Sequence, residues 1–278
     1  MRWWRRWGGS ALAILAVLAL WTCWIEPASL RVVEHRLESD DWPSAIAGLR
    51  IAVLADLHVG SPWNGLDKLH RIVAETNATR PDLVLLVGDY VIRNVLAGTF
   101  IPPTDIAPVL DRLEAPLGVF AVLGNHDWYY GAPRSAGALH AAGLRTLDDD
   151  ALAIDGPHGR FWLVGVSDFW EGPHDVQGAL SHVTDDAPVI LFTHNPDVFP
   201  HVPARVALTI AGHTHGGQVA FPFFGRPIVP SRYGQTYAIG YVVEDGRHLF
   251  VSSGIGTSII PVRFRVPPEI SIVTLDGR

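Results

Sequence analysis

Short apolar runs alternating with polar segments of helical length are the feature that most constrains the fold of this chain. The runs are rich in leucine and β-branched residues and are apolar at consecutive positions, which is typical of strands buried on both faces. They cover 49–55, 83–87, 119–123, 161–166, 189–192 and 207–211. We therefore predict an α/β domain, with helices at 65–79 and 135–142, a strand at 30–37 and a tail from Arg205 rich in strands and turns.

Five of these runs end in polar residues of one chemical kind. The residues are Asp56 and His58, Asp89, Asn125 with His126 and Asp127, His194, and finally His213 and His215. A lone aspartate after a strand is usually a turn residue, and a lone histidine is usually structural. Because the carboxyl ends of parallel strands share one edge of a sheet, five such ends together predict a single site there.

The residue types at these strand ends suit two metal ions. Residues two apart on a strand share a face, so Asp-x-His and His-x-His can each turn two side chains toward one ion. Asp89 can bridge two ions, and Asn125 offers a neutral oxygen that limits the negative charge. Mixed ligands of this kind suit Mn²⁺, Fe²⁺ or Zn²⁺. Two neighbouring ions form a clamp for displacement at phosphorus.

The blocks DLH, GDY, GNHD, THNPD and GHTHGGQ, which run from residue 56 to residue 218, resemble those of the calcineurin-like metallophosphoesterases. The resemblance implies a four-layer α/β/β/α sandwich of two mixed sheets, with a dinuclear metal site at the carboxyl edge of the strands. It implies hydrolysis of phosphoesters by a hydroxide that the two ions activate.

The resemblance also implies a role for each site residue. The first ion would be held by Asp56, His58, Asp89 and His215, and the second by Asp89, Asn125, His194 and His213. His126 would act as a general acid or contact the phosphate, and Asp127 would orient its ring.

Departures from the family's better-known branches narrow the expectation. Purple acid phosphatases place a tyrosine three residues after the bridging aspartate, where this chain has Ile92. Protein phosphatases read GDYVDRG and GNHE, whereas this chain reads GDYVIRN and GNHD. Arg93 would either reach a phosphate oxygen or serve a structural role. The closing motifs at 216–218, 229–233, 254–258 and 267–270 look like a bacterial membrane-anchored branch, some members of which resemble phosphodiesterases and others UDP-2,3-diacylglucosamine hydrolases of lipid A synthesis.

The amino end carries a second strong signal. Residues 1–7 are rich in arginine and tryptophan, and residues 8–25 carry no charge. Eighteen helical residues span roughly 27 Å, just enough for a hydrocarbon core. We expect one transmembrane anchor in a bacterial inner membrane; a cleaved signal peptide and an interfacial helix are the alternatives. The arginines would stay in the cytoplasm and the body would lie outside it, although a UDP-linked lipid would be met inside.

Charge and cysteine content exclude other classes. The formal net charge is -7, and three of the 21 basic residues precede residue 7, which leaves 18 against 28 acidic residues. Such a body is a poor nucleic-acid binder, so neither a nucleic-acid partner nor a nuclease is expected. Cys23 is the single cysteine, so a disulfide framework and a thiolate zinc cluster are excluded. We divide the chain into a basic flank (1–7), the anchor (8–25), a tether with the first strand (26–48) and the catalytic domain (49–278).

Aromatic segments beside the motifs bear on the substrate. The stretch from Phe221 to Val229 follows His215 closely. It would house acyl chains or touch a bilayer; the alternative is that it packs on the sheet as a lid. Trp128, Tyr129 and Tyr130 would stack a ring or form a pocket wall. Few basic residues lie near the motifs, which favours a phosphodiester or pyrophosphate. Together with the anchor, the aromatic segments favour a lipid-linked substrate such as UDP-2,3-diacylglucosamine. A phosphomonoesterase and a non-catalytic metal-binding membrane scaffold are the alternatives. Asp168 and Asp197 are expected to be turn residues.

Overall fold

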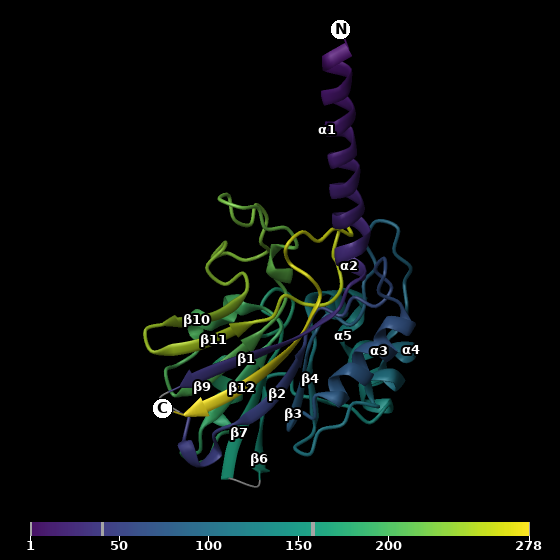
Figure 1. Cartoon of the computed structure of the whole chain (residues 1–278). Coiled ribbons are helices and arrows are strands. Elements are labelled where there is room, and N and C mark those ends of the chain that lie inside the picture. The colour runs from purple at the N-terminus through teal and green to yellow at the C-terminus, as the bar shows by residue number, and fades with distance from the viewer. Residues whose placement is uncertain (1, 40–41, 157–158, 278) are drawn as a thin grey trace.

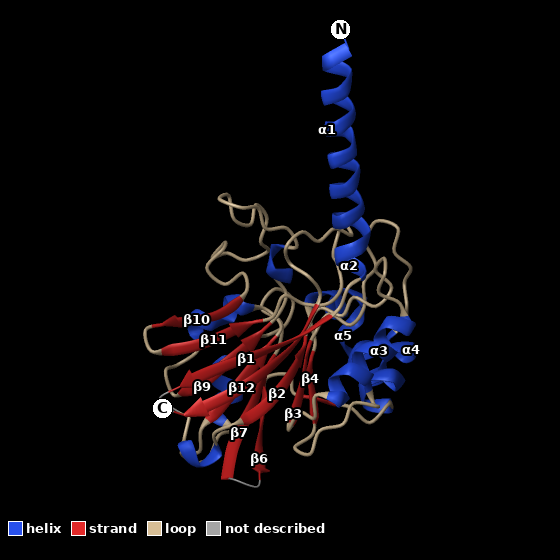
Figure 2. Ribbon diagram, in the orientation of Figure 1, coloured by secondary structure: helices blue, strands red, loops and turns tan. Residues whose placement is uncertain are grey.

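The computed structural model describes residues 2–39, 42–156 and 159–277. Its strands form two mixed six-stranded sheets (Figure 2). The first sheet has the order β1 (Arg31–Ser39), β12 (Glu269–Gly277), β2 (Leu49–Leu54), β3 (Leu83–Val87), β4 (Val119–Val122), β5 (Arg145–Thr146). The second has the order β10 (Gly240–Glu244), β11 (Arg247–Val251), β9 (Val206–Ala211), β8 (Val189–Thr193), β7 (Gly159–Val166), β6 (Asp150–Gly156). The α/β class and the predicted strands are confirmed.

The strands that carry the polar motifs run parallel within their sheets. In the first sheet β2, β3, β4 and β5 are parallel, and in the second β7, β8, β9 and β11 are parallel. The antiparallel strands β6 and β10 form the edges of the second sheet. The carboxyl ends of the parallel strands therefore converge at one end of the molecule.

The main hydrophobic core lies between the two sheets. Ile51, Val53 and Val87 of the first sheet are buried in one cluster with side chains of the second, among them Ile190 and Phe250. Because the opposite faces of these strands are also covered, the runs are apolar at nearly every position. The unbroken apolar character that predicted buried strands thus has a direct cause.

Helices cover the outer faces of both sheets unevenly. The first sheet packs against α3 (Leu66–Ala78), α4 (Pro103–Leu110) and α5 (Asn125–Ala141). The second packs against the short α6 (Val176–Ser181) and the 3-10 turn η3 (Pro196–His201). The predicted helix at 65–79 is confirmed by α3. The predicted start at Ser135 is wrong, because α5 begins at Asn125 and joins two helical pieces across Gly131, whose φ is 128°.

The chain begins with a long helix that projects from the body (Figure 1). It comprises α1 (Arg2–Leu20), a π-helical turn η1 (Trp21–Ile25) and α2 (Glu26–Ala28). Ser10–Ala28 is long and apolar enough to cross a membrane, a property that signal sequences share. The helical segment reaches three residues beyond the predicted 8–25, and its last turns lie against the body.

Candidate metal centre

The predicted site residues come together where the parallel strands end. Asp56 and His58 follow β2, and Asp89 follows β3. Asn125, His126 and Asp127 open α5 directly after β4. His194 follows β8, and the pair of His213 and His215 follows β9. All are buried except His126, which is half-buried.

The ligand atoms fall into groups spaced for metal binding. Within each group these atoms all lie within 4.8 Å of one another. The groups are Asp56 with His58 and His215, Asp89 with His194 and His213, and His58 with Asp89 and His126.

Asp89 stands between the first two groups. Its Oδ2 lies 3.4 Å from His58 Nε2 and 3.3 Å from His194 Nε2. One carboxylate oxygen therefore faces a histidine of each group. This is the position that a bridging ligand requires.

Two histidines are oriented by backbone carbonyls behind them. His194 Nδ1 lies 2.8 Å from the Val87 carbonyl and His58 Nδ1 lies 3.3 Å from that of Val91. An Nδ1–H that donates to a carbonyl leaves the Nε2 lone pair directed into the site. This arrangement fixes the tautomer in which the ring can ligate a cation.

Histidine nitrogens face one another in the site, and a few of its buried polar atoms are unpaired among the described residues. His58 Nε2 and His215 Nε2 face each other at 3.0 Å, and His213 Nδ1 and His194 Nε2 at 3.2 Å. The buried atoms Asn125 Oδ1, His213 Nε2 and His215 Nδ1 have no hydrogen-bond partner among the described residues. Because buried polar groups are normally paired, the facing nitrogens of each histidine pair and the unpaired Asn125 Oδ1 fit divalent cations.

The electrostatics of the site favour the neutral form of His58, His213 and His215. Burial lowers the pKa of His58 to about 3, and burial together with neighbouring histidines lowers the pKa of His213 and His215 well below the ordinary range. Neutral imidazole is the form that ligates metals.

The pKa values of the two carboxylates, Asp56 and Asp89, shift in opposite directions. Burial, opposed by His194 and reinforced by Asp89, raises the pKa of Asp56 to about 7. Burial disfavours the charged form of both Asp89 and His194. Their mutual attraction outweighs burial, so the pKa of Asp89 is lowered and that of His194 is raised to about 10. The protein alone thus keeps a proton in the site as the counter-charge, a role that a cation can take over.

Strained backbone aims the ligands inward. Asp56, His58, Asp89, His213 and His215 all have φ between 41° and 70°, in the left-handed region. Such residues cost on the order of 1–3 kcal/mol each and persist where the surroundings enforce them. The strain turns each strand end sharply, so that side chains from different strands point to one place.

Two glycines allow this close approach. A Cβ on Gly124 would overlap the Asp89 carboxylate, and a Cβ on Gly254 would lie 2.7 Å from Asp56 Cβ and Oδ2. Gly124 stands in a predicted block, whereas no metal-site role was predicted for Gly254. The only sequence signal for Gly254 was its place in the motif at 254–258.

Asp127 supports the backbone that carries Asp89. Its carboxylate accepts hydrogen bonds from the N–H groups of Asp89 at 2.8 Å, Gly124 at 2.9 Å and Tyr90 at 3.1 Å. Burial and the nearby charge of Asp89 raise its pKa to about 8. These bonds go to the loop under Asp89, and the described contacts include none between Asp127 and the ring of His126.

Asp168 holds a turn, as predicted, whereas the carboxylate of Asp197 bonds to a loop far away in the sequence. Asp168 accepts the N–H groups of Trp170 and Glu171, each at 2.9 Å. Asp197 accepts the hydroxyl of Ser231 at 2.6 Å and the N–H of Arg232 at 2.9 Å. Asp197 therefore fixes a distant loop beside the site.

A cavity of about 360 Å³ opens over the ligand cluster, and we call it the active-site cavity. Asp89, Asn125, His126, His213 and His215 lie in its wall. The remaining wall is made by Asn94, Tyr129, Trp170, Thr214, Gly217, Gln218, Ile228, Pro230, Ser258 and Ile259. Most of this second set lies in motifs or aromatic segments that stood out in the sequence, whereas Trp170 and Ile259 were not predicted.

A side cavity of about 600 Å³ adjoins it and shares His126, Tyr129 and Asn94. Arg93, Phe100 and Tyr130 complete its wall. The Phe100 and Tyr130 rings lie 5.3 Å apart, and the Arg93 guanidinium lies 6.0 Å from the Phe100 ring. Tyr129 and Tyr130 thus form cavity walls, one of the two roles expected for them.

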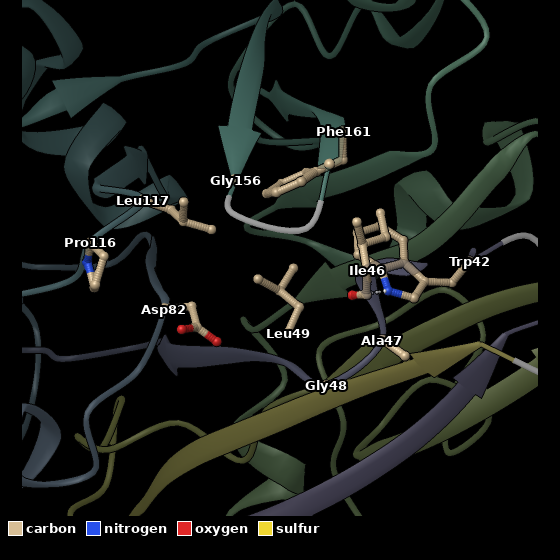
Figure 3. A pocket seen from close by; sticks show the side chains of 11 residues that line it. Trp42, Ile46, Ala47, Gly48, Leu49, Asp82, Pro116, Leu117, Gly156 and Phe161 are labelled. Atoms are coloured by element: carbon tan, nitrogen blue, oxygen red, sulfur yellow. Dashed lines mark hydrogen bonds between the residues drawn. The ribbon is translucent and has the colours of Figure 1, made fainter. Parts of the chain in front are cut away.

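A further cavity of about 220 Å³ lies at the opposite end of the sheets (Figure 3). Trp42, Ile46, Leu117 and Phe161 make it mainly apolar. The carboxylate of Asp82 in its wall accepts the N–H of Arg50 at 2.8 Å. The metal-type groups of the described residues lie at the other end of the sheets.

Comparison with known proteins agrees with this geometry. The family model of the calcineurin-like phosphoesterases matches residues 49–217. The chain is 31% identical to the uncharacterized metallophosphoesterase YkuE of Bacillus subtilis (strain 168), over 91% of this chain and 87% of that protein. It is 31% identical to the phosphodiesterase YaeI of Escherichia coli (strain K12), over 90% of each.

A more distant relative carries a more specific name. The chain is 26% identical to the UDP-2,3-diacylglucosamine pyrophosphatase LpxG of Chlamydia trachomatis, over 94% of each chain. The family match covers more than half of the chain and includes every predicted ligand. The chain therefore belongs to the calcineurin-like phosphoesterase family and is a phosphoester hydrolase.

Proposed function

We propose that the chain is a metal-dependent phosphodiesterase or pyrophosphatase. The observation that carries this proposal is the wall of the active-site cavity, in which the described residues include no lysine or arginine. A terminal phosphate carries an extra negative charge and favours added cationic groups, whereas a diester carries one charge. The wall therefore suits a phosphate flanked by two substituents.

The proposal assigns the ligands as the family resemblance implies. Asp56, His58, Asp89 and His215 would hold one divalent ion, and Asp89, Asn125, His194 and His213 the other. When bound, the ions polarise phosphoryl oxygens and lower the pKa of water. Mn²⁺, Fe²⁺ and Zn²⁺ all suit this donor set.

The chain's own residues supply positioning and proton transfer. His126 is half-buried in the cavity wall and its ring lies 4.8 Å from that of His58, so it is placed to donate a proton to the leaving oxygen. The N–H of His126 donates to Asp89 Oδ1 at 2.8 Å, and Asp127 holds the Asp89 backbone. Together these bonds fix the distance between the proton donor and the bridging carboxylate.

The apolar part of the cavity points to an amphiphilic substrate. Trp170, Ile228, Pro230 and Ile259 form the apolar part of its wall. A lipid-linked pyrophosphate such as UDP-2,3-diacylglucosamine would place its acyl part there, and LpxG carries that activity in its name. We include this compound in the proposal as the first lipid substrate to test.

The membrane assignment belongs to the same proposal. The helix at 8–25 would anchor residues 49–278, the catalytic domain, to the bacterial inner membrane through the tether at 26–48. The arginines of residues 1–7 would remain in the cytoplasm and the catalytic domain would lie outside it.

A phosphomonoesterase is the main alternative. Arg93 favours it, because this guanidinium lines the side cavity next to His126 and could neutralise a terminal phosphate. A non-catalytic scaffold is disfavoured, since the complete ligand set and His126 are present.

The test compares two chromogenic substrates. The full chain, purified in detergent, would be stripped with a chelator, reloaded with Mn²⁺, and assayed with bis-p-nitrophenyl phosphate and p-nitrophenyl phosphate. Faster metal-dependent cleavage of the diester supports the proposal. Preference for the monoester would replace it with the phosphomonoesterase, and activity that survives chelation would remove the metal mechanism.

A further inference from the structure

Six large apolar side chains stand exposed on the loops that also carry wall residues of the active-site cavity. Phe223 is fully exposed, and Phe224, Ile228 and Ile259 are 85%, 76% and 73% exposed. We call these residues, together with Leu96 and Ile260, the apolar rim. Clustered exposed apolar groups on a folded protein mark an interaction surface.

The apolar rim is continuous with the cavity. Ile228 and Ile259 belong to both, since they line the cavity and face solvent. The N–H of Leu96 donates to the carbonyl of Ile259 at 3.0 Å, which joins two of the loops that carry the rim. Whatever covers the rim therefore lies at the mouth of the active-site cavity.

The loops hold these side chains outward by fixed geometry. Phe221 and Gly225 exchange backbone hydrogen bonds of 2.8 and 3.0 Å and close a tight turn with Phe223 at its tip. Phe223 and Ile259 have φ of 70° and 62°, a conformation that is costly for residues of their size. Because the strain exposes rather than buries these side chains, packing within the body does not explain it.

The segments that carry most of the apolar rim are basic, although the protein as a whole is acidic. The segments 218–239 and 252–268 contain Arg226, Arg232, Arg263 and Arg265 and no aspartate or glutamate, in a chain with 28 acidic residues. Arg232 and Arg265 are exposed. Two such surfaces would repel each other in a symmetric dimer, whereas anionic lipid headgroups complement them.

The apolar amino-terminal helix leaves the body beside the rim. The N–H of Arg263 donates to the carbonyl of Thr22 at 2.9 Å, and the rings of Trp24 and Trp63 stack at 4.7 Å. Figure 1 shows the segment between β9 and β10 projecting from the same end of the body as α1. The last helical turn and the rim therefore face the same side.

We propose that the apolar rim docks on the surface of a lipid bilayer, with Phe223 and Phe224 at the boundary between headgroups and acyl chains. The exposed Arg232 and Arg265 then lie against lipid phosphates. The mouth of the active-site cavity then opens onto the membrane surface. The docking itself does not require catalysis; the consequence that an amphiphilic substrate enters from the bilayer rests on the proposed function.

A site-specific fluorophore tests the docking. In the full chain with Cys23→Ser, Phe223→Cys carries an environment-sensitive dye, and the protein is reconstituted into vesicles of phosphatidylcholine and phosphatidylglycerol. A matched variant carries the dye at Asp186→Cys, an exposed position before β8 at the opposite end of the sheet. We expect spin-labelled lipids to quench the dye at 223 and aqueous iodide to quench the dye at 186.

Equal iodide quenching at both positions, without quenching by lipid, would overturn the docking. Shielding of position 223 that depends on protein concentration rather than on lipid would also overturn it, in favour of a second copy. Both readouts are independent of activity, so the docking can stand even where the proposed function fails.

Substitution of the rim tests substrate entry. Phe223→Ser with Phe224→Ser should leave hydrolysis of soluble bis-p-nitrophenyl phosphate unchanged, because neither residue lines the cavity. Losing two interfacial phenylalanines should slow hydrolysis of hexadecyl p-nitrophenyl phosphate in vesicles by about tenfold or more. The control pair, Val32→Ser with Val243→Ser, removes exposed apolar side chains from β1 and β10. Equal vesicle rates for the two pairs would refute entry from the bilayer.

Discussion

Asp89 links the two groups of metal ligands at the scale of single residues. Its Oδ2 faces His58 Nε2 at 3.4 Å and His194 Nε2 at 3.3 Å. Asp89→Asn removes the charge but keeps the shape. We expect metal binding to weaken in both groups and hydrolysis to be lost, as measured by metal content after gel filtration and by the diester assay.

The control for Asp89→Asn is Asp105→Asn, the same chemical change at an exposed position of α4. It should keep both metal content and activity. If Asp89→Asn retains activity, Asp89 does not bridge the two groups.

Substitution of His126 distinguishes a catalytic role of this residue from a role as a metal ligand. Its ligand atom lies within 4.8 Å of those of His58 and Asp89, yet the ring is half-buried and borders both cavities. His126→Ala should keep metal content near normal while turnover falls by about 10²–10⁴-fold, the usual loss for a general acid. Loss of metal in this variant would make His126 a ligand.

Metal affinity should depend on pH. Burial raises the pKa of Asp56 to about 7, and Asp89, acting against burial, raises that of His194 to about 10. His194 holds a proton below pH 10 and Asp56 below pH 7, and each must lose it to ligate a cation. Affinity should therefore fall as pH decreases, by about tenfold per unit for each proton released, and more steeply below pH 7. Calorimetric titration with Mn²⁺ between pH 6 and 8 measures this, and a constant affinity would contradict it.

At the scale of elements, the strand ends were predictable and the loops were not. A strand buried on both faces is recognisable in the sequence as an unbroken apolar run. Polar residues that follow such runs, such as Asp89 after 83–87 and His194 after 189–192, can therefore be identified from the sequence. The loop at 252–268 has no such contrast. Only the structure shows that buried Arg263 ties it together by donating to the carbonyls of Gly256 at 2.7 Å and Val266 at 2.8 Å.

The same limit explains the error in α5. The segment after β4 begins with the polar residues Asn125, His126 and Asp127 and contains Gly131 and Pro133. These residues have low helix propensity and interrupt the apolar periodicity by which a helix is recognised in a sequence. The tertiary requirement to seat Asn125 and His126 at a helix start overrides that local preference. The helix after Pro133 was therefore predicted and the part before it was missed.

The loop at 252–268 should be intolerant of a methyl group at Gly254. Its φ is 66°, and an added Cβ would press on Asp56. Gly254→Ala should lower metal content and activity, as measured on the purified chain. Gly137→Ala is the matched control, because no atom lies within 4 Å of its added Cβ on α5. There alanine should stabilise the fold by about 0.5–1 kcal/mol. Equal metal content in the two variants would show that loop contact with Asp56 is unimportant.

At the scale of the whole molecule, the junction between helix and body was not predictable. The sequence suggested a tether after residue 25, whereas the helix end makes specific contacts. Glu26 accepts the indole N–H of Trp21 at 2.7 Å and the N–H of Val266 at 2.7 Å. Lys68, the single lysine, donates to the carbonyl of Pro27 at 3.0 Å. Long-range pairs of this kind leave no periodic trace in a sequence.

These contacts lead us to expect a retained anchor rather than a cleaved signal. Cleavage near residue 24 would remove the ring that stacks on Trp63 and the Cys23 carbonyl that accepts its indole N–H at 2.9 Å. Trp63 would then lose the partner of its ring and of its indole N–H. Mass spectrometry of the membrane fraction should therefore find a chain that includes residues 2–25 and resists extraction by alkaline carbonate. A mature chain that begins after Cys23 would show instead that the helix is a signal peptide and that the body meets its substrate without it.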